Sequence, residues 1–157
     1  DVMRLDEPMR EAIAARLALL AIEAGRLVLD LHDRGLPIVT KSDGSPTTEA
    51  DLSAERLILT RLAQWWPHVP AVAEETASAA QAGPVFFLVD PVDGTKDFLA
   101  GTGEFTVNIA LVSEGRPVAA AVAAPKLRKA WRAGVTAEAA MIPADASATP
   151  VWRPVCV

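Results

Sequence analysis

Residues 84–95 read PVFFLVDPVDGT, and this stretch is the centre of the predicted fold. Its first six residues form an apolar run that stops at Asp90, which predicts a strand buried on both faces with a carboxylate at its end. Asp93 follows three residues later, so both carboxylates can point into one cleft. Such hard oxygen ligands suit Mg²⁺, which keeps several waters and binds one or two carboxylates together with phosphate oxygens.

The residues on either side of this stretch extend the predicted site. Gly94 and Thr95 are expected to open a short helical turn, whose free amide groups can donate hydrogen bonds to a phosphate. Glu74 and Glu75 end a short apolar strand upstream, and Glu74 would reach the same cleft if the two strands lie near each other. Two metal ions among three carboxylates could activate a water and stabilise the leaving oxygen.

A fourth carboxylate comes from a predicted helix. Thr47 or Thr48 can cap this helix, Asp51 lies in its first turn, and Pro67 ends it. The Asp51 carboxylate could hold the Thr95 hydroxyl and thereby orient the attacking water.

The remaining segments predict a layered α/β arrangement. Apolar residues recur at intervals of three and four from residue 8 to 34, which predicts a long amphipathic helix with Asp6 as its cap and Gly35 as its stop. Further segments are expected as a strand at 36–40, an exposed loop at 41–46, strands at 105–112 and 116–124 joined by a Glu114-Gly115 hairpin turn, and another strand starting near Trp131.

Composition limits the classes of function. The chain has 157 residues, 51% of them apolar and 22% charged, which is typical of a single globular domain. Its net charge of -5 and the lack of a basic run disfavour binding to long nucleic acid. A single cysteine, Cys156, excludes an intrachain disulfide or a zinc cluster. Without a signal peptide or an apolar run of 18 residues, a cytoplasmic protein with no transmembrane segment is predicted.

Three motifs, in order and spacing, resemble the inositol monophosphatase family of magnesium-dependent, lithium-sensitive phosphatases. They are KSDGSPTTEAD at residues 41–51, AEE at residues 73–75 and DPVDGTKDF at residues 90–98. Within the family, KDF at residues 96–98 and GEFTVNIA at residues 103–110 are most similar to CysQ-type 3'(2'),5'-bisphosphate nucleotidases. The resemblance extends from the first helix to about residue 140.

The resemblance implies a role for each motif residue. Two or three Mg²⁺ ions would be bound by Glu74, Asp90, Asp93 and the backbone carbonyl of Val92. Asp51 and Thr95 would position the water, while Gly94, Thr95, Asp93 and Lys41 would hold the phosphate, with Glu75 and Lys96 supporting the ligands. The implied substrate is adenosine 3',5'-bisphosphate, which links the chain to sulfur assimilation, and the implied assembly is a homodimer.

The implied fold is the N-terminal portion of the family's α/β layered sandwich, with paired long helices on a largely antiparallel sheet. It would occupy residues 1–143, followed by an irregular tail at residues 144–157. The family's second portion carries a Trp-Asp motif that has no counterpart here, because Trp131 precedes Arg132 and Trp152 precedes Arg153. A truncated or frame-shifted product is therefore expected.

The sequence leaves two alternatives open. The same chemistry could act on an inositol or sugar phosphate, or the chain could be an inactive fragment that binds metal or a partner. A haloacid dehalogenase site is excluded, since that class needs its nucleophilic aspartate where this chain has Pro91. His32 and His68 are interpreted as surface residues without a role in the site.

Overall fold

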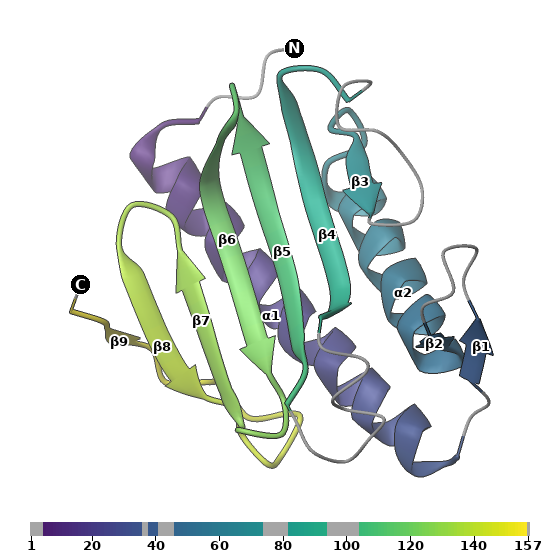
Figure 1. Ribbon diagram of the computed structural model, residues 1–157. Helices are drawn as coiled ribbons and strands as arrows, with labels where there is room; N and C mark the ends of the chain where they lie inside the picture. The colour runs from purple at the N-terminus through teal and green to yellow at the C-terminus, as the bar shows by residue number, and fades with distance from the viewer. Residues whose placement is uncertain (1–4, 36–37, 41–45, 74–81, 94–103, 157) are drawn as a thin grey trace.

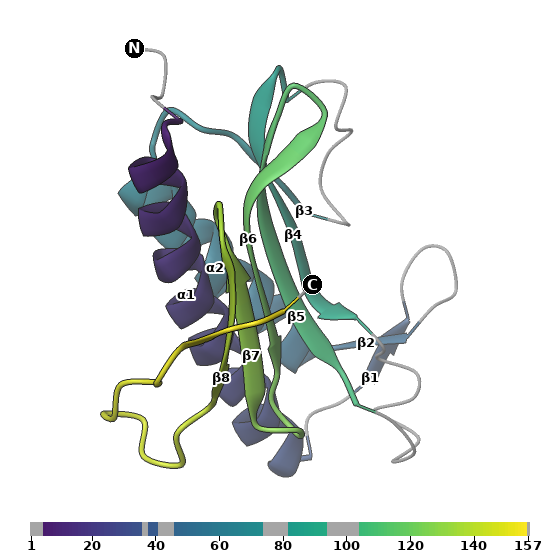
Figure 2. The ribbon, with the colours of Figure 1, turned by 90° about the vertical axis from the view of Figure 1, so that its left-hand side faces the viewer.

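The computed structural model describes residues 5–35, 38–40, 46–73, 82–93 and 104–156. Two helices, α1 (Glu7–Asp33) and α2 (Glu49–Trp65), pack side by side against one face of a large sheet (Figure 1). Seen from the side, no described helix covers the opposite face of that sheet (Figure 2). The predicted α/β layered fold, with paired helices on a sheet, is thus confirmed.

The sheet contains seven strands in the order β3-β4-β5-β6-β7-β8-β9, and only β3 and β4 run parallel. Their bounds are β3 (Ala71–Ala73), β4 (Val85–Asp93), β5 (Thr106–Ser113), β6 (Arg116–Ala124), β7 (Lys129–Ala133), β8 (Ala137–Met141) and β9 (Arg153–Pro154). A separate antiparallel pair, β1 (Ile38–Thr40) and β2 (Pro46–Thr48), precedes α2.

Helix α1 begins and ends as its sequence predicts. The Asp6 carboxylate accepts a hydrogen bond of 3.0 Å from the backbone N–H of Met9, which satisfies one of the free amide groups of the first turn. At the other end, Gly35 adopts a φ of 70°, a left-handed conformation that ends helices. Among the recurring apolar positions that predict this helix, Ile13, Leu17, Leu20 and Ala24 are buried, whereas Met9 is 40% exposed.

Small residues allow α1 to approach the sheet closely. A Cβ atom on Gly25 would lie 2.5 Å from Cγ of Pro125, and one on Gly134 would lie 2.7 Å from the backbone carbonyl carbon of Arg10. The Arg10 guanidinium also donates hydrogen bonds to the carbonyls of Val118, at 2.8 Å, and Gly134, at 3.0 Å. Strands β6 and β7 therefore fix the position of α1.

The strands at residues 105–112 and 116–124 are confirmed within one residue, as β5 and β6. Their hairpin turn has positive φ at both central positions, 50° at Glu114 and 78° at Gly115. This turn geometry matches the right-handed twist of the paired strands. Trp131 lies in β7, where a further strand was predicted to start.

Several expectations are corrected. The strand expected to stop at Asp90 continues to Asp93. It is not buried on both faces, because Leu88 is 46% exposed on the side away from the helices. Pro46, expected in a loop, begins β2. Strand β8 was not predicted, and two residues of the tail, expected to be irregular, pair with it as β9. Strand β8, with the sequence AEAAM, is rich in alanine, which has weak β propensity.

Candidate metal and phosphate site

Strand β4 brings two of the predicted site positions onto one face of the sheet. In a regular strand, residues three apart point to opposite faces. Here Asp90 pairs with Asn108 and Asp93 pairs with Thr106, so three steps along β4 match two steps along β5. This extra residue is a β-bulge, and it gives positions 90 and 93 register partners on the same face of β5.

The bulge also accounts for a proline inside a paired strand. Pro91 has no backbone N–H to donate to the ladder, and bulges are among the few places where strands accept proline. Pro91 and the next residue, Val92, are both buried, and Val92 is only 8% exposed. The backbone that carries the predicted carbonyl ligand is therefore held inside the protein, between the two acidic positions.

The surroundings of Asp90 are polar on the face away from the helices. Asp90 itself is half-buried, and its Oδ1 atom is buried from solvent. On the neighbouring strand, Nδ2 of Asn108 donates a hydrogen bond of 3.0 Å to Oγ1 of Thr106. The end of β4 is therefore lined by oxygen-bearing and amide-bearing side chains, in contrast to the apolar core on the other face.

Parallel pairing of β3 with β4 aligns a third predicted element with this end. Ala73, the last residue of β3, pairs with Val89, one residue before Asp90. Glu74 was expected to reach the cleft if the two strands lie near each other, and the register shows that they are neighbours. Glu74, the predicted ligand that follows Ala73, lies outside the described residues.

Asp51 lies in the first turn of α2, as predicted, and is only 9% exposed. A carboxylate at this position is favoured by the free amide groups and the positive dipole end of the helix. One turn later Glu55, 7% exposed, forms a second buried acidic position that the sequence analysis missed. The signal was available, because Glu55 stands four residues after Asp51 on the face that carries the core residues Ala54 and Ile58.

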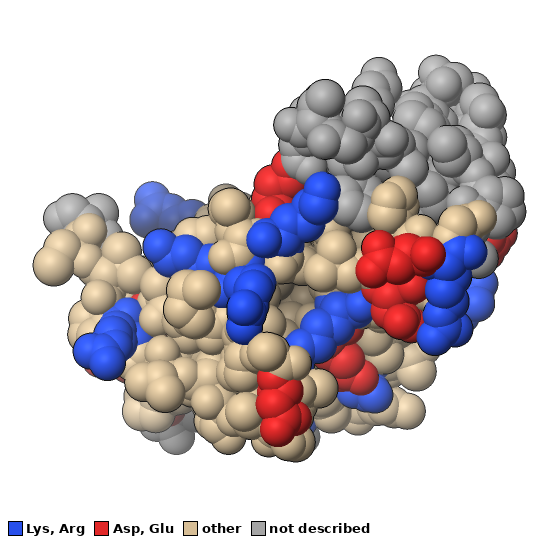
Figure 3. Space-filling model, turned by 90° about the horizontal axis from the view of Figure 1, so that it is seen from below, with Lys and Arg blue, Asp and Glu red and all other residues tan. Residues whose placement is uncertain are grey.

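The start of α2 and the end of β4 lie at the same end of the molecule (Figure 1). On the described surface of this end, basic and acidic side chains are interspersed (Figure 3). The other predicted site residues fall outside the described ranges: Lys41, Glu74, Glu75, Gly94, Thr95 and Lys96. The side chain of Asp93 is not described either. Among the described residues, no three His, Cys, Asp or Glu side chains form a group able to hold a metal ion.

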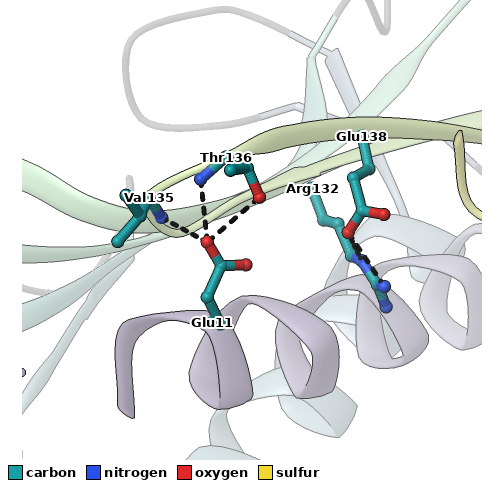
Figure 4. A network of polar contacts seen from close by, with 5 residues as sticks. All are labelled: Glu11, Arg132, Val135, Thr136 and Glu138. Carbon is teal, nitrogen blue, oxygen red and sulfur yellow. Dashed lines mark hydrogen bonds and ion pairs between the residues drawn. The ribbon is translucent and has the colours of Figure 1, made fainter. Parts of the chain in front are cut away.

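Perturbed carboxylates occur elsewhere, in structural roles. Glu11 accepts hydrogen bonds from the backbone N–H groups of Val135 and Thr136, each at 2.8 Å, and from the Thr136 hydroxyl at 3.1 Å (Figure 4). The backbone of Thr136 does most to lower the pKa of Glu11, and burial opposes it. Hydrogen bonds from Ser147 likewise lower the pKa of Asp145 in the tail. Each carboxylate stabilises a local turn rather than the predicted site.

None of the described helices is long and apolar enough to cross a membrane.

Comparison with families and curated proteins gives the same assignment as the motifs. A model described as the inositol monophosphatase family matches residues 9–143. A 3'(2'),5'-bisphosphate nucleotidase CysQ of Salmonella typhimurium is 40% identical over 126 residues, which are 72% of this chain and 51% of that protein. The CysQ of Escherichia coli strain K12 is 39% identical over the same shares. This chain thus spans about half the length of the curated relatives it matches.

Solved structures agree with the fold. An IMPase of Thermotoga maritima matches with a TM-score of 0.67 and 27% identity, over 78% of this chain and 48% of that one. CysQ of Bacteroides thetaiotaomicron, a bacterial member of the inositol monophosphatase family, matches with a TM-score of 0.66 and 30% identity, over 89% and 53%. The predicted family resemblance is therefore confirmed.

Proposed function

This chain belongs to the inositol monophosphatase family, and we propose that it forms the metal-binding and phosphate-binding part of a Mg²⁺-dependent 3'(2'),5'-bisphosphate nucleotidase. The reaction would convert adenosine 3',5'-bisphosphate and water to AMP and phosphate. The observation that carries the proposal is the β-bulge in β4, which gives positions 90 and 93 partners on one face of β5. β-bulges often change the direction of side chains next to active sites, and this bulge would orient positions 90 and 93 as metal ligands.

The donor set fits magnesium. Asp90, Asp93, Glu74 and the Val92 carbonyl offer only hard oxygen donors, and no soft sulfur ligand is near them in the sequence. These residues would hold two or three Mg²⁺ ions. When bound, Mg²⁺ would lower the pKa of a coordinated water and neutralise charge on the phosphate oxygens.

The remaining motif residues would position the water and the phosphate. We assign the buried carboxylate of Asp51 to accept a hydrogen bond from the Thr95 hydroxyl, which in turn orients the attacking water. The backbone N–H groups of Gly94 and Thr95 would donate to phosphate oxygens. Lys41 would contribute a point charge to the same phosphate.

Two further residues would support this arrangement. Glu75 follows the proposed ligand Glu74, and Lys96 follows Thr95. Residues next to metal ligands commonly orient them through hydrogen bonds, and their loss weakens metal binding by about 10- to 100-fold. We therefore expect smaller losses from changes at these two positions than from changes at the ligands.

The nucleotide specificity rests on the relatives. The CysQ proteins of Salmonella typhimurium and Escherichia coli carry the name bisphosphate nucleotidase. Because the matching IMPase of Thermotoga maritima has the same fold, an inositol or sugar phosphate is the second candidate substrate class. Both substrates require the same metal and phosphate site.

A substrate comparison tests the proposal. The purified chain is supplied with adenosine 3',5'-bisphosphate or inositol 1-phosphate, first with Mg²⁺ and then with a chelator, while released phosphate and bound Mg²⁺ are both measured. We expect chelator-sensitive release from the bisphosphate nucleotide. A preference for inositol phosphate would contradict the proposed nucleotide substrate. Mg²⁺ binding without phosphate release would leave this chain a metal-binding protein without phosphatase activity. Absence of Mg²⁺ binding would contradict the proposed metal site.

A further inference from the structure

A groove lies at the opposite edge of the sheet from β3, between β8 and the segment that follows it. The chain swings away from β8 after Met141 and returns to pair with it as β9 (Figure 2). The groove is open to solvent, and its volume is about 510 Å³, within the range of small-molecule sites. The residues that decide its character are Lys129, Ala139, Met141, Thr149, Val151 and Arg153.

Strand register places two cationic residues on the same face as the floor of the groove. Ala139 pairs with Trp131 on one side and with Arg153 on the other. Met141, two residues further along β8, pairs with Lys129. Cross-strand partners share a face of the sheet. The intervening β8 residue Ala140 is buried, so these five positions lie on the face opposite the helices.

The walls of the groove are apolar and accessible. Met141 is 61% exposed and Val151 is 70% exposed, although both are large hydrophobic side chains. Among the described residues that line the groove, Thr149 alone carries a hydroxyl. An occupant with an apolar body would remove this surface from water, which is the main source of affinity in such sites.

The side chains of Lys129 and Arg153 make the groove positively charged. The Lys129 ammonium lies over the Trp131 ring, 5.3 Å from its centroid, which restrains the lysine without neutralising it. Within the described ranges, neither Lys129 nor Arg153 forms an ion pair with an acidic side chain. The groove therefore presents positive charge although the chain as a whole has a net charge of -5.

We propose that this groove binds a small amphipathic anion, with an apolar body against Met141 and Val151 and a carboxylate or phosphate head between Lys129 and Arg153. The site is independent of the proposed metal site, because β8 lies four strand positions from β4, about 19 Å away. Its outer wall also comes from residues after 143, where the family match ends.

Calorimetric titration of the chain with sodium octanoate tests the proposal, with octanol and sodium sulfate as probes of the apolar body and the anionic head alone. We expect saturable binding of octanoate and weaker binding of both fragments. The K129Q/R153Q double variant should weaken octanoate binding about tenfold, the effect of losing one good charged hydrogen bond. Both positions are exposed, so the fold should tolerate the change.

Arg116→Gln is the matched control, since Arg116 is exposed on β6 and does not line the groove. It should leave the octanoate affinity unchanged. An equal loss of octanoate affinity in this control would show that the effect comes from net charge alone, and it would overturn the proposal. Equal affinity for octanol, absence of octanoate binding, or binding only to anionic lipid vesicles would overturn it as well. Phosphate release is scored separately, because K129Q/R153Q should not alter it.

Discussion

The two ends of the sheet use carboxylates in different ways. At the end where α1 begins, the partly exposed Glu11 accepts three hydrogen bonds from neutral groups of Val135 and Thr136. At the end where β4 finishes, Asp51 and Glu55 are 9% and 7% exposed, and Asp90 has a buried oxygen. Neutral donors are sufficient to hold one carboxylate near solvent, whereas burial of a carboxylate costs free energy unless hydrogen bonds or a cation compensate for its lost hydration. We call the first the attachment end, because it holds α1 against the sheet, and the second the binding end, because the proposed metal site lies there.

Loss of a ligand at the binding end should have the largest effect. Asp90→Asn and Asp93→Ala should each lower Mg²⁺-dependent phosphate release by at least about 100-fold, because removal of a carboxylate leaves the cations with too few ligands. Phosphate release and Mg²⁺ affinity are measured together. Unchanged Mg²⁺ affinity in Asp93→Ala would count heavily against the assignment.

The stability of Asp90→Asn tests whether the Asp90 carboxylate serves metal binding or the fold. Asp145→Asn, a change of the same charge on the exposed tail, is the matched control for activity and should leave it unchanged. Without Mg²⁺, Asp90→Asn should not lower the free energy of unfolding in urea, because it removes a partly buried charge. A marked destabilisation would show that Asp90 serves the fold as Glu11 does.

The next largest effect is expected at the attachment end. Gly134→Ala should lower the free energy of unfolding by about 2–3 kcal/mol, because the new Cβ would lie 2.7 Å from backbone atoms of Arg10, which have little freedom to move. Urea denaturation measures the change. Gly115→Asn is the control, since no atom lies within 4 Å of a Cβ there and asparagine tolerates positive φ. Equal losses in both variants would contradict the close approach.

A smaller, pH-dependent effect is expected for Glu11→Gln. The hydrogen bonds lower the pKa of Glu11 in the folded state, so its stabilisation is fully present above the unfolded pKa of about 4.3 and is lost as the pH falls through the folded pKa. At pH 7 the variant should lose about 1 kcal/mol, a value reduced for solvent exposure. Urea denaturation of the parent chain and the variant between pH 7 and pH 3 should give free energies of unfolding that converge as the pH falls. A difference that stays constant with pH would show that the charge of Glu11 does not contribute to stability.

The smallest effect should come from a pair that belongs to neither end. Arg61 on α2 forms a bidentate ion pair with Glu23 on α1, with distances of 2.9 and 3.1 Å between guanidinium nitrogens and carboxylate oxygens. Both side chains are substantially exposed, so Arg61→Ala should cost less than about 1 kcal/mol. The double variant with Glu23→Ala completes a mutant cycle, and a coupling energy of several kcal/mol would contradict this ranking.

Much of the fold could be predicted because local signals act over short distances. The Asp6 cap, the Gly35 stop and the Glu114-Gly115 turn each depend on a few neighbouring residues. Strand β8 could not be found this way, since the sequence AEAAM has little β propensity and becomes a strand only by pairing with β7. Leu88 was expected to be buried because an apolar run does not reveal which face is covered.

The sequence predicts the residues of the proposed site but not their geometry. A spacing of three between Asp90 and Asp93 would place them on opposite faces of a regular strand, and only pairing with β5 shows the bulge that corrects this. Glu55 stands four residues after Asp51, a spacing that places both on one face of α2, but the spacing alone does not show that this face is buried. Its burial follows from how α2 packs on the sheet.

The docking of α1 on β6 and β7 also determines when this helix can be covered during synthesis. Gly25 meets Pro125, and Arg10 bonds to Val118 and Gly134, so partners more than 90 residues downstream complete its packing. At a translation rate of about 5–20 residues per second, these strands leave the ribosome roughly 5–20 s after the helix. In that interval the apolar stripe of α1 is a natural target for chaperones that bind nascent chains.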